Sequence, residues 1–191
     1  IERWRRAQGL AVWDPDRGLP VFQCPSDVTS ARFALYAEET AREPAGAAET
    51  HDPPRLLTWL PSANYVGLFG TSDPDDVPGE TGDGAFLQSR PVRFAELQRG
   101  QSQTMLVGER TQRKLPATWV GFVIAGEDAP SRVVGYARLG PNRSDADECE
   151  LDSRHAGFIN VLWADGRVEA VGNSVDVRIY RHSAQRSESD F

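Results

Sequence analysis

Cysteine, lysine and long apolar runs are scarce in this sequence of 191 residues, and each scarcity excludes a class of protein. The two cysteines, Cys24 and Cys149, are too few for a multi-cysteine zinc motif. Lys114 is the only lysine, and the formal net charge is −7. This balance argues against a nucleic-acid or anionic membrane partner, because clustered Lys and Arg bind polyanions. No run approaches the roughly 18 apolar residues of a membrane-spanning helix.

The two cysteines are compatible with two free thiols or with one long-range disulfide, and we expect the disulfide. A bridge from Cys24 to Cys149 closes a loop on the order of 100 residues and, in the chain-entropy model, stabilises a fold by about 4–5 kcal/mol. It also predicts an oxidising, extracytoplasmic compartment, because disulfides are rare in the cytosol.

The length predicts one domain with a single core. We place this domain at residues 1–182 and expect the polar tail, residues 183–191, to fray. Residues 38–54 are rich in Ala, Glu, Thr, Gly and Pro, which indicates a mobile surface loop. A short helix is expected at residues 92–99 because Gly100 follows as a stop signal. Short strands are predicted at three further places: residues 32–37, 104–109 and 119–124.

A β-hairpin is the clearest element near the C-terminus. Residues 158–164 and 167–172 are rich in β-forming side chains and flank Asp165-Gly166, a strong turn signal in which Gly166 permits a positive φ. A two-residue turn would place Trp163 opposite Val168. The side chains expected on the core face are then Ile159, Val161, Trp163, Val168 and Ala170.

The three histidines are the only imidazole bases available to a hydrolase. His51 falls in the predicted mobile loop and His182 at the predicted tail, which leaves His155. No Gly-x-Ser-x-Gly elbow or activated cysteine accompanies His155, so we favour a structural role in the turn before the hairpin. If the hairpin register continues, His155 lies opposite Asp176.

An acidic loop at residues 71–84 carries five carboxylates within a short stretch. Hard cations such as calcium prefer dense oxygen ligands, but the spacing does not fit an EF-hand, and a solvated loop is the alternative. The candidate calcium ligands are Asp73, Asp75, Asp76, Glu80 and Asp83.

One sequence signature near the C-terminus is His155, nine residues, then Asp165-Gly166. Four further segments lie upstream: Cys24-Pro25-Ser26-Asp27, Asn64-Tyr65-Val66-Gly67, Gly82-Asp83-Gly84-Ala85-Phe86 and Thr104-Met105-Leu106-Val107-Gly108-Glu109-Arg110. In this order the segments resemble the planctomycete-type pseudopilin-like proteins, which carry a prepilin N-terminal segment and a C-terminal His-x9-Asp-Gly signature.

The resemblance implies an α+β fold, a pilin-like globular head that is mostly antiparallel β-sheet with few short helices. It also implies a hydrophobic pilin helix upstream of this chain, which anchors the subunit in the inner membrane, with the head outside the cytoplasm. The implied partners are other pilin-like subunits and inner-membrane components of a secretion system. Related major pseudopilins order a C-terminal loop with calcium, which draws attention to Asp145, Asp147, Glu148, Glu150 and Asp152.

The expected function is that of a non-enzymatic structural subunit of a type II secretion-like pseudopilus or pilus. In this interpretation Cys24 and Cys149 staple the head, and His155 and Asp165 fix the last hairpin. The leading alternative is an extracytoplasmic module that binds a sugar, a peptide or an ion, and a secreted hydrolase is the third. A cleft lined by Trp or Tyr would favour the binding module.

Overall fold

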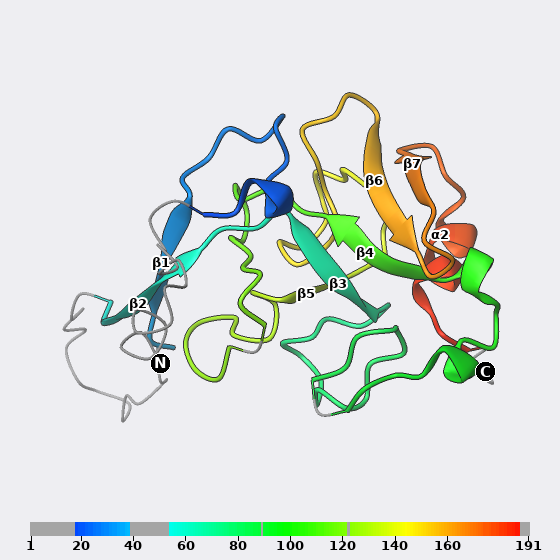
Figure 1. The fold of residues 1–191 in the computed structure, drawn as a ribbon, viewed down its shortest axis with the longest axis horizontal. Helices are drawn as coiled ribbons and strands as arrows, with labels where there is room; N and C mark the ends of the chain where they lie inside the picture. The colour runs from blue at the N-terminus through cyan, green and yellow to red at the C-terminus, as the bar shows by residue number, and fades with distance from the viewer. Residues whose placement is uncertain (1–17, 39–53, 89, 122, 188–191) are drawn as a thin grey trace, which may run out of the picture.

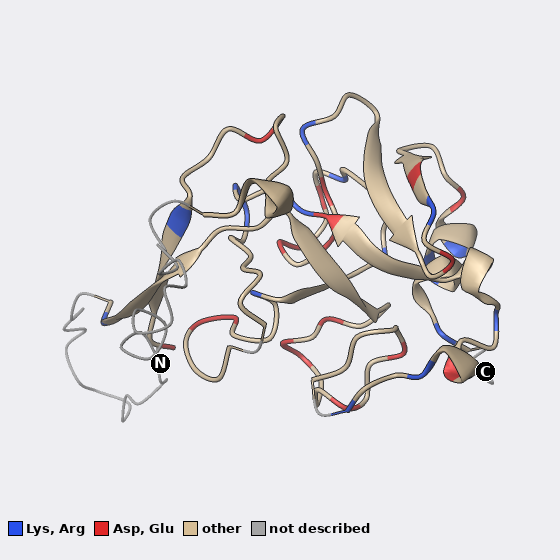
Figure 2. Ribbon diagram, viewed as in Figure 1, with Lys and Arg blue, Asp and Glu red and all other residues tan. Residues whose placement is uncertain are grey.

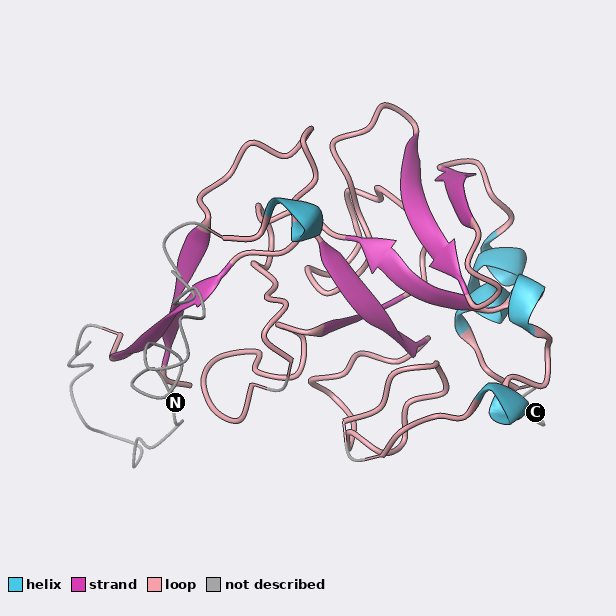
Figure 3. Cartoon of the chain, in the orientation of Figure 1, coloured by secondary structure: helices cyan, strands magenta, loops and turns pink. Residues whose placement is uncertain are grey.

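β-Strands and loops dominate the computed structural model, which describes residues 18–38, 54–88, 90–121 and 123–187 (Figures 1 and 3). The strands are β1 (Arg32–Tyr36), β2 (Leu56–Pro61), β3 (Tyr65–Gly70), β4 (Met105–Glu109), β5 (Val134–Tyr136), β6 (Phe158–Trp163) and β7 (Val168–Gly172). The helical elements are α2 (Val177–Ala184) and three 3-10 turns, η1 (Pro20–Phe22), η2 (Phe94–Glu96) and η3 (Gln101–Gln103).

The strands form two sheets. β1 and β2 make an antiparallel pair, and the other five strands form a sheet in the order β5-β3-β4-β6-β7. Only the β3–β5 pairing in that sheet is parallel. The β1–β2 pair lies at the opposite end of the molecule from α2 (Figure 1). The expected α+β fold with mostly antiparallel sheet is therefore confirmed.

The main core lies between one face of the five-stranded sheet and α2. Alternate residues of β6 are buried, as expected for a strand with one face against the core. Tyr180 and Ala184 bring α2 into this core, and the Asp176 carboxylate caps the helix by accepting the backbone N–H of Arg178. The core residues are Val66, Leu68, Met105, Ala117, Ala137, Leu151, Ile159, Val161, Trp163, Tyr180 and Ala184.

The other face of the sheet carries apolar side chains that are partly or largely exposed. Leu162 points away from the core because its neighbours Val161 and Trp163 point into it, and its partners Val107 and Val168 share its side of the sheet. Val168 is 66% exposed. We call the surface formed by Val107, Leu162, Val168 and Ala170 the open sheet face.

The hairpin register differs from the prediction by one residue. Phe158 pairs with Gly172 and Leu162 with Val168, so the turn contains Ala164, Asp165 and Gly166 rather than two residues. A three-residue turn of this kind ends in a residue with positive φ, and Gly166 supplies it at 88°. Because a one-residue shift moves a strand's side chains to the opposite face, the predicted core positions Val168 and Ala170 are wrong. Val171 packs against the core instead.

Three other sequence predictions also change. Residues 119–121 form bends rather than a strand, and residues 123–124 have no regular structure, since the sheet contact in this region is the bridge between Ala63 and Ala117. The helix expected at residues 92–99 is reduced to the single turn η2. The tail does not begin to fray at residue 183, because Ser183, Ala184 and Gln185 are buried at the end of α2. Most of the predicted mobile loop, residues 39–53, lies outside the described residues.

Candidate functional site

The end of β4 carries a buried carboxylate, Glu109, whose side chain is 2% exposed. Glu109 Oε2 accepts the backbone N–H of Asn160 at 2.7 Å, and Oε1 accepts the Asn160 side-chain amide at 3.1 Å. Glu109 lies on the same side of the sheet as Val107, because side chains two residues apart along a strand share a face. The backbone and the side chain of Asn160 in the neighbouring strand β6 therefore hold the carboxylate at one end of the open sheet face.

His155 approaches this carboxylate from the loop before β6. Its backbone N–H donates to Ser153 Oγ, and its ring stacks on Phe158 with centroids 5.0 Å apart. His155 Nε2 lies 3.2 Å from Glu109 Oε1 and 3.4 Å from Cys24 Sγ. The predicted pairing with Asp176 is wrong, because the shifted register ends the ladder at Phe158 and Asp176 caps α2.

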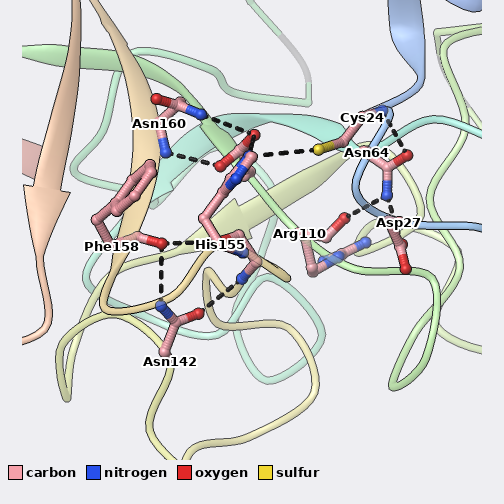
Figure 4. A network of polar contacts seen from close by, with 10 residues as sticks. Cys24, Asp27, Asn64, Arg110, Asn142, His155, Phe158 and Asn160 are labelled. Atoms are coloured by element: carbon pink, nitrogen blue, oxygen red, sulfur yellow. Dashed lines mark hydrogen bonds and ion pairs between the residues drawn. The ribbon is translucent and has the colours of Figure 1, made fainter.

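Asn64 connects the segment around Cys24 to the start of β3. Its Oδ1 accepts the backbone N–H of Cys24 at 2.9 Å, while its amide donates to Asp27 Oδ2 at 2.7 Å and to the carbonyl of Arg110. Asp27 also accepts a hydrogen bond from Arg154, the residue before His155. Three segments far apart in sequence thus meet around one amide side chain (Figure 4).

Arg110 extends the network toward β5. Its guanidinium is buried and donates to the backbone carbonyls of Ser131, Val134 and Cys149. Burial lowers the pKa of Arg110 to about 10, so this arginine remains charged at neutral pH. It acts as a cross-link between β4 and the loops on either side of β5.

We call the residues Cys24, Asp27, Asn64, Glu109, Arg110, His155 and Asn160 the buried node. The space beside its members Cys24, Asn64 and Glu109 leaves no room for a water molecule. On that side of the node a substrate therefore has no cavity to enter. His155 Nε2 also faces both the thiol and the carboxylate, whereas a catalytic triad uses the two ring nitrogens for separate partners.

The predicted disulfide is wrong, since both cysteines are free and buried. Cys24 contacts His155, whereas Cys149 packs with Leu115 and Tyr136 and its thiol lies 3.6 Å from Asp75 Oδ2. The two sulfur atoms therefore have different neighbours and do not contact each other. Burial is the main cause that raises the pKa of the Cys149 thiol far above its ordinary value.

The acidic loop does not gather its five carboxylates at one point. Asp83 accepts the backbone N–H and the hydroxyl of Thr71, both at 2.7 Å, and also the Gln185 amide. Asp76 and Glu80 are exposed. Figure 2 shows acidic positions spread along the loop that follows β3. Among the described residues, only Asp73 of the five joins a group with three potential metal ligands within 4.8 Å of one another, together with Asp147 and Cys149. Burial raises the pKa of Asp73, and Asp147 and the other nearby carboxylates raise it further.

Asp165 and Gly166 lie at the far end of β6 from His155. Asp165 Oδ1 accepts the backbone N–H of Arg167, and its Oδ2 pairs with the Arg167 guanidinium. Arg167 in turn donates to the carbonyl of Ser102 in η3. These two motif residues therefore shape the hairpin turn and lie outside the buried node.

Sequence reasoning left Asn64, Glu109, Arg110 and Asn160 out of the candidate site. Glu109 and Arg110 end an apolar strand segment, a position at which charged side chains are ordinarily exposed. Asn160 lies 51 residues from Glu109, and the partners of Arg110 lie 21 to 46 residues away, so spacing carries no signal for these contacts.

A second set of potential metal ligands lies within the buried node. The Cys24 thiol, a Glu109 oxygen and a His155 nitrogen all lie within 4.8 Å of one another. None of the helices in the described ranges is both long and apolar enough to cross a membrane.

Comparison with known proteins gives one match. The family model SBP_bac_10, described as "Protein of unknown function (DUF1559)", matches residues 2–178. No curated protein and no solved structure matches the chain. The match spans all five of the sequence segments that carry the pseudopilin resemblance.

Proposed function

The chain belongs to the DUF1559 family of proteins of unknown function, and from that membership we propose that it is the globular head of a pilin-like filament subunit. The filament would be a type II secretion-like pseudopilus or pilus. The head would be held outside the cytoplasm by an upstream inner-membrane helix. Its partners would be other pilin-like subunits and inner-membrane components of the secretion system.

The open sheet face is the observation that carries this proposal. One face of the sheet is buried by α2 and by loop residues, while the opposite face presents Val107, Leu162 and Val168 without full burial. Contiguous exposed apolar side chains are characteristic of interaction surfaces. A long amphipathic helix could cover a flat apolar sheet face of this kind, and burial of its side chains would contribute about 25 cal/mol per Å² of apolar surface.

The buried node supports a scaffold role. It ties Cys24, Asn64 and Glu109 together from three parts of the chain, and the space beside these three residues leaves no room for a reacting molecule. A network of this type fixes the positions of loops and strands when its members are satisfied. We therefore propose that the chain has no enzymatic activity.

The alternative binding module has less support. A recess of about 300 Å³ lies beside Phe86, Phe94 and Leu106. Among the described residues no Trp or Tyr lines it, so that part of the chain does not give it the aromatic faces with polar edges that suit a sugar. Its apolar lining is instead close to the open sheet face, because Phe86 packs directly over Gly67, the β3 partner of Val107.

A pair of substitutions tests the filament proposal. In cells that produce the natural full-length protein, Val168→Asp is expected to remove the protein from sheared surface filaments. Ile179→Asp is the matched control, since Ile179 is 62% exposed and lies on α2 rather than on the open sheet face. Both variants of the isolated head should melt like the wild type. Equal incorporation of the Val168→Asp protein, or the absence of the wild type from any filament, would contradict the proposal.

A further inference from the structure

Three side chains of different chemistry converge within the buried node. Cys24 comes from the segment after η1, Glu109 from the end of β4 and His155 from the loop before β6. One sulfur, one oxygen and one nitrogen atom lie within 4.8 Å of one another. These are the ligand atoms that Zn²⁺ takes in proteins.

Two of the three distances fit the edges of a tetrahedral site, and the third, from Cys24 Sγ to a Glu109 oxygen, is within 4.8 Å. Bonds of about 2.3 Å to sulfur and about 2.0–2.2 Å to nitrogen and oxygen place neighbouring ligand atoms roughly 3.3–3.6 Å apart. Cys24 Sγ lies 3.4 Å from His155 Nε2, and that nitrogen lies 3.2 Å from Glu109 Oε1. A single ion between the three atoms would therefore need little movement of the side chains.

Hydrogen bonding leaves one conflict at the nitrogen that faces both neighbours. His155 Nε2 is shared by Cys24 and Glu109, and one ring nitrogen either donates a proton or accepts one. If it donates to Glu109, the thiol proton has no acceptor on that nitrogen. If it accepts from the thiol, Glu109 Oε1 keeps only the Asn160 side-chain amide as a donor. A cation bound to all three atoms removes this conflict.

The surroundings of the three side chains resemble the supporting contacts of a metal site. Asn160 donates two hydrogen bonds to Glu109 and so fixes the carboxylate, while stacking on Phe158 fixes the His155 ring. Such outer contacts orient metal ligands and raise affinity. The His155 side chain is 22% exposed, which gives an ion a path from solvent.

We propose that Cys24, Glu109 and His155 bind one Zn²⁺ ion, with a solvent molecule from the His155 side as the fourth ligand. The Cys24 thiol loses its proton to the solvent when the sulfur coordinates the metal. The bound ion joins the first described segment of the head to β4 and to the loop before β6. This role is independent of whether the head belongs to a filament.

Cobalt substitution tests the site on the tag-free chain, because Co²⁺ bound to a thiolate has a charge-transfer absorption. The wild type should bind one Co²⁺ per chain with this band, and Zn²⁺ should displace it. Cys24→Ser should lose the band, and Cys149→Ser should keep it. Cys149 is the matched control, since it belongs to the other potential ligand group, with Asp73 and Asp147.

Two further variants separate metal binding from a folding defect. His155→Gln should weaken Zn²⁺ binding, measured by calorimetry, by more than about 100-fold, because loss of a ligand exceeds the 10–100-fold effect of a supporting contact. Asn160→Ala should weaken it by about tenfold and keep the cobalt–thiolate band. Absence of binding to the folded wild type would overturn the proposal. So would a band that persists in Cys24→Ser and disappears in Cys149→Ser.

Discussion

Thr111 holds the Asp152 carboxylate at two points within the protein. Its backbone N–H donates to Oδ1 at 2.7 Å and its hydroxyl donates to Oδ2 at 2.8 Å, and both residues are buried. The same contact joins Thr71 to Asp83 nearer the surface, at 2.7 Å for both bonds. One local motif therefore fixes two different loops to the ends of β3 and β4.

Replacement of Thr111 by valine should destabilise the head by about 1–3 kcal/mol. The substitution keeps the shape of the side chain but leaves Asp152 Oδ2 as a buried oxygen without its donor. The free energy of unfolding from urea titration measures the effect. Thr111→Ser keeps the hydroxyl and should cost less, and Thr71→Val should also cost less because water can reach that site. Equal stability of Thr111→Val and the wild type would show that the hydroxyl contributes nothing.

Alanine at position 166 should lower the free energy of unfolding by about 1–3 kcal/mol. Gly166 has a φ of 88°, which a residue with a Cβ adopts only with strain, and a Cβ there meets no atom within 4 Å. The cost is thus a backbone effect alone. Gly172→Ala in the same hairpin is the control. Gly172 lacks a positive φ, and the nearest atoms to a Cβ there, 3.9–4.0 Å away, are at ordinary van der Waals distance. Similar melting midpoints for the two variants would argue against the three-residue turn.

The hairpin shows how far the sequence could predict the fold. The two strands and the turn glycine could be predicted, because Asp165-Gly166 is a strong local signal for a hairpin turn. The register was not, since Asp-Gly suits a two-residue turn and also the last two positions of a three-residue turn. In the predicted register the apolar residues Val168 and Ala170 would face the core, and in the observed register Val171 does. Apolar alternation along this strand therefore did not distinguish the two registers.

Stability should fall as the pH rises above about 4.5, in part because of Glu150. This buried carboxyl has its pKa raised from 4.5, mainly by burial, so the folded state holds its proton more tightly than the unfolded chain does. The stability it contributes is present at low pH and is lost as the pH rises through the raised pKa. Denaturant unfolding between about pH 4.5 and pH 7 measures the slope.

Glu150→Gln should flatten this dependence and gain stability relative to the wild type as the pH rises. Glutamine can still accept a hydrogen bond from the backbone N–H of Leu139. Asp145→Asn is the control, because Asp145 is exposed and the guanidinium of Arg143 lowers its pKa. A parallel pH profile for Glu150→Gln and the wild type would show that Glu150 does not cause the slope.

The buried node marks the limit of prediction from the sequence. The segments that contain Cys24, Asn64 and His155 were recognised as motifs, but the sequence could not show that they meet. A disulfide between Cys24 and Cys149 was the simplest prediction for two cysteines. In the structure both are free, and each contacts a different side chain. Contacts of this kind depend on the sheet order, in which β4 lies between β3 and β6.

Two alkyl groups should attach to each chain when the protein is unfolded without reductant and treated with iodoacetamide. Both cysteines are free, so neither requires reduction before it reacts. In the folded protein Cys149 should react slowly at neutral pH, because it is buried and burial raises the pKa of its thiol, and the thiolate is the reactive form. Intact mass spectrometry counts the adducts, and Cys24→Ser and Cys149→Ser assign them. If the unfolded chain gained no adduct until reductant was added, the result would support the predicted disulfide and contradict the structure.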